Sequence, residues 1–185
     1  ITVSAFSGLE TETASLKIDA TGEKAIATLR LKTFWDRHKK GLVSGNTHLH
    51  VMKLSREDCD RYLEDVPKGD DLDVLFLSYL ERADADRTYI SNKYNTADLR
   101  GLAQKTGVVF GNGEEHRHNF SGFGAGYGHV MLLNIKELVQ PVSIGPGIMK
   151  TGYDGIPLTR GIQQAKRDGA TAIWCHNVFG VESEV

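Results

Sequence analysis

Two histidines at alternate positions, His48 and His50, are the residues of this chain whose types and spacing most directly indicate chemistry. They close the segment Gly-Asn-Thr-His-Leu-His. In a β-strand, residues i and i+2 lie on the same face, so the two imidazoles point the same way. Neutral imidazole is a common ligand of zinc, iron and manganese ions. The pair therefore predicts part of a metal site, although two solvated histidines on a surface strand give the same pattern.

Further side chains of the metal-binding type lie at the ends of segments that read as strands. Glu81 follows the apolar run 73–79, His176 ends the last predicted strand, and His129 opens another. In barrels of parallel strands, the active site is built at the carboxyl ends of the strands. A carboxylate and several histidines spread over such ends favour a common site over separate structural roles.

The segment 114–118, Glu-Glu-His-Arg-His, supplies the densest group of such side chains. If it is extended, Glu114, His116 and His118 share one face, and Glu115 and Arg117 share the other. The spacing does not decide which of the two carboxylates is a ligand. A solvated charged loop is the alternative interpretation.

The elements that must position these residues alternate between strand and helix from Leu42 onward. The continuous apolar run 73–79 is typical of a buried parallel strand. Helices are predicted after the N-cap residue Ser55, from Thr96 to Gly107, and within 155–169. This alternation indicates an α/β fold with parallel strands and helical crossovers. Parallel strands are predicted to end at His50, Tyr79, Glu115 and His176.

Residues 1–40 read as β-structure followed by a linker. Alternating apolar and polar residues at 15–19 and 25–31 predict two strands of a hairpin. Phe34 and Trp35 are expected to pin the linker to the next domain. Two or three strands do not make a stable domain alone, so the segment is expected to pack onto something else.

The composition limits the classes of function. The chain has 185 residues, 25% of them charged and 40% hydrophobic, and a net charge of -2. These values are ordinary for a soluble globular protein and give no sign of a nucleic acid or an anionic membrane as partner. No apolar run approaches the ~20 residues of a membrane-spanning helix. The chain begins at Ile1 rather than methionine, and we expect it to be a processed product or part of something longer. The sequence assigns no compartment.

Four motifs, in this order, resemble those of the PHP (polymerase and histidinol phosphatase) metallohydrolases. Segment 45–50 resembles the opening Gly-Asp-Thr-His-x-His motif, and 113–115 resembles the Gly-x-Glu motif. Segment 128–133 matches the strand that starts with Gly-His. Segment 174–177 matches the strand that ends with His-Pro, with Asn177 in place of proline. The preceding β segment is similar to the accessory β domain of the carbamate- and amide-hydrolase-like branch.

The resemblance implies a distorted parallel (β/α) barrel over 41–185, preceded by the β segment and incomplete at its carboxyl end. It also implies a site for one to three divalent ions (Zn, Mn or Fe) at the carboxyl rim of the barrel, with Glu115 as the bridging carboxylate. The metal ligands that it implies are His48, His50, Glu115, His129 and His176.

Two departures from the family pattern affect this site. The Asp-His pair of the second family motif is Tyr79-Leu80 here, and leucine cannot bind a metal. Glu81 could substitute, or one ion could be lost. The late Asp-x-His motif is absent, and the roughly 140 residues after Leu42 are fewer than the ~200–250 of a full barrel. A missing C-terminal segment or a second copy in a homo-oligomer is therefore expected to complete the barrel.

Two functions follow from this reading. The first is a metal-dependent hydrolase that uses a metal-activated water on a small-molecule phosphoester, amide or carbamate. His116 or His118 would move a proton or orient the leaving group, and Arg82 or Arg117 would bind an anionic group of the substrate. The alternative is a catalytically degenerate barrel that binds a metal or ligand without hydrolysis, which Tyr79-Leu80 favours. A cupin-type site also uses His-x-His but disagrees with the predicted helices.

Overall fold

The computed structural model describes residues 1–19, 21–22, 24, 26–80, 88–118, 128–139 and 158–175. The strands are β1 (Thr2–Ala5), β2 (Thr11–Glu12), β3 (Ala14–Lys17), β4 (Lys32–Thr33), β5 (Gly45–Leu49), β6 (Val74–Tyr79), β7 (Val109–His118), β8 (Gly128–Leu133) and β9 (Thr171–Trp174). The α-helices are α1 (Arg56–Gly69), α2 (Thr96–Thr106) and α4 (Thr159–Asp168). Two short 3-10 helices are η1 (His38–Lys40) and η3 (Ile90–Lys93).

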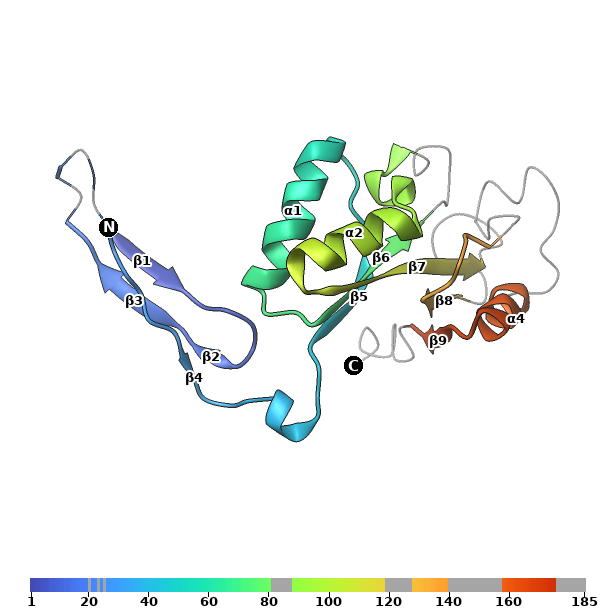
Figure 1. The fold of residues 1–185 in the computed structure, drawn as a ribbon, viewed down its shortest axis with the longest axis horizontal. Coiled ribbons are helices and arrows are strands. Elements are labelled where there is room, and N and C mark those ends of the chain that lie inside the picture. Colours follow the sequence, from blue (N-terminus) through green and yellow to red (C-terminus); the bar gives the residue numbers. More distant parts are fainter. Residues whose placement is uncertain are drawn as a thin grey trace, which may run out of the picture.

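A curled five-stranded sheet in the order β5-β6-β7-β8-β9 forms the centre of the fold (Figure 1). The strands β5, β6 and β7 pair in parallel, whereas β8 is antiparallel to both β7 and β9. The predicted distorted parallel (β/α) barrel is therefore wrong for the described chain, whose mixed sheet with three helices forms a half-barrel. The nine residues between His118 and Gly128 are too few for a parallel crossover, which takes a dozen or more.

Side-chain caps start α1 and α2, and glycines end α2 and α4. The Ser55 side chain accepts a hydrogen bond from the Asp58 amide at the start of α1, as predicted. A capping box formed by Asn95 and Asp98 starts α2, so the cap is Asn95 rather than Thr96, from which the helix was predicted to start. Gly107 and Gly169 end α2 and α4 in the left-handed conformation, as predicted. Within the described residues, no helix is long and apolar enough to cross a membrane.

The helices cover one face of the sheet, and the apolar core lies between them and the strands. Leu75 and Leu77 of β6 pack into one cluster with α1 and α2. Val130 and Leu132 of β8 pack into a second cluster with Ala165 of α4. Because side chains alternate along a strand, the intervening residues of β6, β7 and β8 point to the opposite face.

The N-terminal residues form an arm of two small antiparallel sheets, β1–β3 and β2–β4, which extends from the body (Figure 1). The described residues of 25–31 form no strand, so the second strand of the predicted hairpin is wrong. Phe34 and Trp35 are 61% and 42% exposed and do not pin the linker. A buried arginine, Arg37, does so by bonding to Glu10 of the arm and to two aspartates of the body, Asp71 and Asp73.

Candidate metal centre

Three predicted ligands converge on one point at the carboxyl ends of β5 and β7. The His50 Nε2 atom lies 2.9 Å from both the His48 Nε2 atom and the Glu115 Oε2 atom. The His48 Nε2 atom lies 3.3 Å from the same carboxylate oxygen. These three side chains could hold a metal ion.

A bulge in β5 turns the two histidines towards Glu115. Asn46 pairs with Leu75, but Leu49 pairs with Leu77. The step between the two pairs is three residues long in β5 and two residues long in β6. With regular pairing, His48 would share the face of Leu77, under the helices. The extra residue moves it to the opposite face, which is also the face of Glu115. The His48 amide donates to the Asn46 side chain across the bulge at 3.0 Å.

The backbone of β6 fixes the proton position of His50. The His50 Nδ1 atom lies 2.9 Å from the carbonyl oxygen of Ser78, which can only accept a hydrogen bond. Nδ1 must therefore carry the hydrogen, and in neutral imidazole Nε2 then presents a lone pair. Metal-binding histidines are oriented in the same way by a carbonyl or carboxylate behind the ring.

This geometry places lone pairs against one another unless a cation lies between them. The Nε2 lone pair of His50 faces a carboxylate oxygen of Glu115 at 2.9 Å, and the Glu115 side chain is only 6% exposed. Either a proton on His50 or a metal ion removes the repulsion. Two ligands about 2.0–2.1 Å from a tetrahedral ion lie about 3.3 Å apart. The observed separations of 2.9–3.3 Å fit such an ion after an opening of a few tenths of an ångström.

A fourth predicted ligand, His129, lies on the other side of the carboxylate. Its Nε2 atom is 3.5 Å from the Glu115 Oε1 atom, and its ring centre is 6.5 Å from that of His48. It reaches Glu115 because β8 runs antiparallel to β7 and brings its first residues beside the end of β7. Glu115 therefore has histidines near both carboxylate oxygens.

The group is open on the side of His48. The His48 side chain is 34% exposed, whereas those of His50 and His129 are 16% and 12% exposed. A small molecule could therefore approach an ion held by the group from the side of His48.

The structure does not bring His116 to this group. Its neighbour Glu115 points to the metal face, so His116 points to the helix-covered face. The His116 side chain is fully buried and its Nδ1 atom lies 2.8 Å from the Glu114 Oε1 atom. The other oxygen of Glu114 accepts a hydrogen bond from the Val139 amide at 2.8 Å, and Gly161 of α4 packs against the His116 ring. Within the described residues, the Nε2 atom of His116 has no hydrogen-bond partner.

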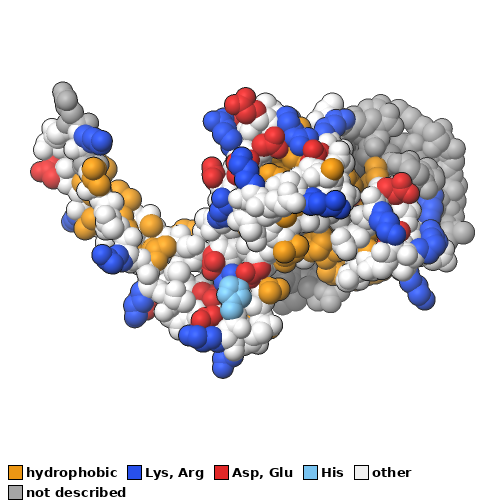
Figure 2. Space-filling view, viewed as in Figure 1, with side chains coloured by type: hydrophobic (Ala, Val, Ile, Leu, Met, Phe, Trp, Pro, Cys, Tyr) orange, Lys and Arg blue, Asp and Glu red, His pale blue; other side chains and the backbone are white. Residues whose placement is uncertain are grey.

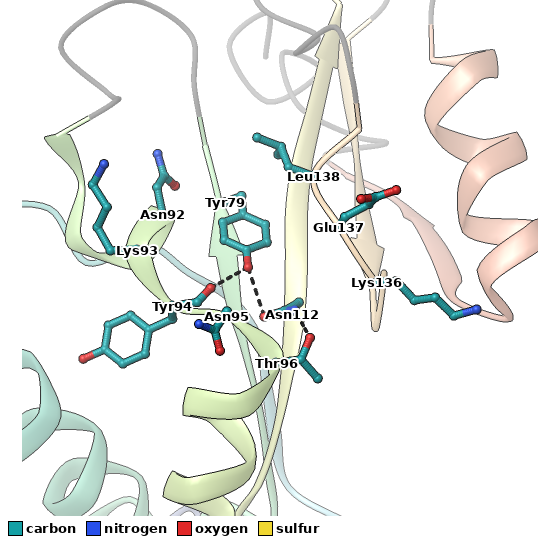
Figure 3. Close-up of a pocket in the computed structure, with 10 residues that line it drawn as sticks. All are labelled: Tyr79, Asn92, Lys93, Tyr94, Asn95, Thr96, Asn112, Lys136, Glu137 and Leu138. Carbon is teal, nitrogen blue, oxygen red and sulfur yellow. Dashed lines mark hydrogen bonds between the residues drawn. The ribbon is translucent and has the colours of Figure 1, made fainter.

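Tyr79 at the end of β6 also points away from the metal face. It pairs with Glu114, so it lies on the helix-covered face. There it lines a cleft of about 590 Å³ between η3, α2 and the segment after β8 (Figure 3). Its hydroxyl donates to the Tyr94 carbonyl and to Asn112, whose amide donates to Thr96. Burial raises the pKa of Tyr79, which keeps this donor protonated.

The remaining predicted site residues cannot be placed at the group. Three of them lie outside the described residues: Glu81, Arg82 and His176. Arg117 and His118 belong to β7, but their side chains are also outside what the structure describes. The contribution that sequence reasoning missed is the carbonyl of Ser78, because a backbone acceptor leaves no signal in the sequence.

Comparison with known proteins does not assign this chain to a family. No family model matches the chain, and no curated protein or solved structure matches it. The resemblance to the PHP metallohydrolases remains a prediction from the motifs quoted above.

Proposed function

We propose that this protein is a metal-dependent hydrolase that holds a divalent ion through His48, His50 and Glu115. The observation that carries the proposal is the orientation of His50. The Ser78 carbonyl behind the ring directs the Nε2 atom of His50 at a buried carboxylate, an arrangement that a metal ion between the two groups would stabilise, as a proton on His50 also would.

The donor set narrows the choice of ion. Two imidazole nitrogens and one carboxylate oxygen suit Zn, Fe or Mn, whereas Ca and Mg prefer oxygen ligands alone. Three protein ligands with a further position for water or substrate are typical of catalytic rather than structural zinc sites. The exposure of His48 agrees with an open position on that side.

The chemistry of such an ion fits hydrolysis. A bound divalent ion lowers the pKa of a water molecule towards about 7 and polarises a scissile carbonyl or phosphoryl group. Glu115 contributes a negative charge that is shielded from solvent, and His50 is held in register by β6. His129, beside the second oxygen of Glu115, is placed to orient that carboxylate or to hold a proton. The proposed substrates are small phosphoesters, amides or carbamates.

A second candidate function is metal binding without catalysis. The side chain of Tyr79 points away from the metal face, and Leu80 beside it is a buried apolar residue. Neither can replace the acid and the histidine that the family motif has at these positions. Non-ligating residues at positions 79 and 80 are what a protein that binds metal without hydrolysing a substrate would have.

Hydrolysis after removal and return of metal distinguishes the two candidates. The chain is treated with a chelator, reloaded with Zn²⁺, Mn²⁺ or Fe²⁺, and assayed on chromogenic phosphoester, carbamate and anilide substrates. We expect one substrate class to be hydrolysed only with metal. Glu115→Gln should lower that rate more than about 100-fold, because loss of an outer-shell partner alone costs 10–100-fold. The exposed Glu137→Gln is the matched control and should keep the rate.

Each other outcome removes one of the two proposals. Hydrolysis that is independent of metal, or equal in Glu115→Gln and Glu137→Gln, would contradict the hydrolase proposal. Metal binding without hydrolysis of any of the three classes would favour the second candidate.

A further inference from the structure

The cleft that Tyr79 lines lies on the helix-covered face of the sheet, opposite the metal group (Figure 3). One wall is formed by η3 and the start of α2, and the other by the segment 136–138, with Tyr79 and Asn112 between them. Its volume of about 590 Å³ is within the range of roughly 300–1,000 Å³ of pockets that bind small molecules. Tyr79 ends β6, and open α/β sheets bind ligands in crevices outside the carboxyl ends of their strands.

Hydrogen bonds hold both walls of the cleft in place. The Asn92 side chain accepts from the Leu80 amide at 3.0 Å and donates to the Leu80 carbonyl at 2.8 Å. On the other wall, the Lys136 amide donates to the Asp168 carboxylate of α4 at 3.2 Å. The cleft is therefore preformed, which lowers the cost of ordering it around a ligand.

Bonds within the protein occupy acceptors along the wall of the cleft and leave donors. The Asn95 Oδ1 atom accepts from the Ala97 and Asp98 amides at 2.8 and 3.0 Å, so the side-chain NH₂ group keeps both of its hydrogens. The Thr96 hydroxyl accepts from the Asn112 side chain at 3.0 Å and keeps its own hydrogen. Within the part of the chain that the structure describes, the Asn95 NH₂ group and the Thr96 hydroxyl hydrogen have no acceptor. The cleft therefore offers chiefly donors to a ligand.

Positive charge adds to these donors. Lys93 lies on one wall and Lys136 on the other, and neither forms an ion pair within the described residues (Figure 3). Their flexible stems allow both ammonium groups to turn towards a ligand. Among the described lining residues, Glu137 is the single acid, and Figure 3 shows its carboxylate directed away from Tyr79. Figure 2 shows further basic side chains at the surface over α2 and beside α4.

We propose that this cleft binds a small molecule through a carboxylate or phosphate group. Such groups present negative charge and chiefly acceptors, which match the donors of Asn95 and Thr96 and the two lysines. Thr96 is also the first residue of α2, and the amino end of a helix favours an anion. A neutral ligand would leave the lysine charges unused, and a cation would be repelled by them.

Three probes with the same carbon skeleton test the class of ligand. Glycerol 3-phosphate, glycerate and glycerol are titrated to about 10 mM into the full chain at constant ionic strength, and binding is followed by calorimetry and by the amide shifts of α2. We expect a dissociation constant on the order of 1 mM for at least one of the two anions, which moderate ligand efficiency gives a molecule of about ten atoms. The anion that binds more tightly identifies the group. Binding of neither anion, or equal binding of glycerol, would overturn the proposal.

A variant that keeps the helix cap locates the site. Asn95→Asp should leave α2 intact, because the two residues cap helices equally well, but it replaces the free NH₂ group with a carboxylate oxygen. Gln104→Glu adds the same charge at an exposed position of α2, nine residues and roughly 13 Å further along, beyond the screening length of about 8 Å. Anion affinity should fall by about tenfold or more in Asn95→Asp and stay nearly unchanged in Gln104→Glu. Equal binding by the two variants would overturn the proposal, because the anion would then bind elsewhere.

The His50→Ala variant separates this site from the metal centre. It should bind the anion as wild type does, because His50 meets Glu115 on the opposite face of the sheet. Loss of anion binding in His50→Ala would overturn the proposal, since the anion would then be held at the metal centre. Anion binding by a chain that hydrolyses nothing would support it, because the cleft does not depend on the proposed hydrolase activity.

Discussion

Replacing Gly161 with alanine should destabilise the protein by forcing α4 away from the sheet. A Cβ atom at this position would lie 2.4, 2.5 and 2.7 Å from three atoms of the His116 ring, closer than real contacts allow. The ring cannot move aside easily. It is buried, it is bonded to Glu114 at 2.8 Å, and Glu114 is held by the Val139 amide.

The size of the effect follows from two opposing contributions. Overpacking a buried contact costs about 1–3 kcal/mol. Alanine in a helix is favoured over glycine by about 1 kcal/mol. Gly101 of α2 isolates the second contribution, because it is exposed and a Cβ there would meet nothing within 4 Å. Gly101→Ala should therefore raise the free energy of unfolding by about 1 kcal/mol. The difference between the two variants measures the overpacking itself, about 1–3 kcal/mol.

Urea unfolding of both variants, followed by circular dichroism, gives this difference directly. Zinc affinity should stay unchanged in Gly161→Ala, because His116 and Glu115 point to opposite faces of β7. If Gly161→Ala and Gly101→Ala are equally stable, His116 does not lie beneath α4. If Gly161→Ala loses metal while it remains folded, the separation of the two faces is wrong.

Three further predictions concern the arm and α2. Arg37→Met should free the arm and speed its proteolysis, because it leaves the buried Glu10 carboxylate without its guanidinium partner, a loss of about 3–5 kcal/mol for buried pairs. The hydrogen bond from Arg37 is the main cause that lowers the pKa of Asp73, and the hydrogen bond from the Ser44 amide is the second. The contribution of Asp73 to stability is therefore present above the ordinary carboxyl pKa of about 3.9 and should be lost as the pH falls below it. Proteolysis at stepwise lower pH, with Asp73→Asn as the variant that lacks the acid dependence, measures this. Asn95→Ala should lower the free energy of unfolding in urea by about 1 kcal/mol through loss of the α2 cap.

Local features of the fold were predictable from the sequence because they depend on near neighbours. The apolar run at 73–79 forms β6, and Ser55, Gly107 and Gly169 mark helix ends as expected. The direction of β8 depends on the whole topology. The alternation of strands and helices suggested parallel strands throughout, and the resemblance to the PHP metallohydrolases suggested a barrel. The signal against it was the short connection after His118, which leaves too little chain for a parallel crossover.

The site shows the same division between local and long-range information. The spacing of His48 and His50 correctly predicts that they share a face, but the face itself is chosen by the bulge after Asn46, which the sequence does not reveal. Neighbouring residues of a strand point to opposite faces, so Glu115 and His116 could already be assigned to different faces of β7 from the sequence. Once Glu115 is a ligand, His116 must point into the core, so its predicted catalytic role lacked support from the same alternation that was used for the histidines.

Metal binding by the intact chain tests the central claim most directly. Chelator-treated protein is titrated with Zn²⁺ by calorimetry, and the bound ion is counted by elemental analysis. We expect wild-type protein to hold zinc and His50→Ala to lose it, whereas His38→Ala should bind as wild type does, because His38 is an exposed histidine paired with Asp73 outside the group. Absence of zinc binding, or equal binding by His50→Ala and His38→Ala, would contradict a metal centre at His48, His50 and Glu115.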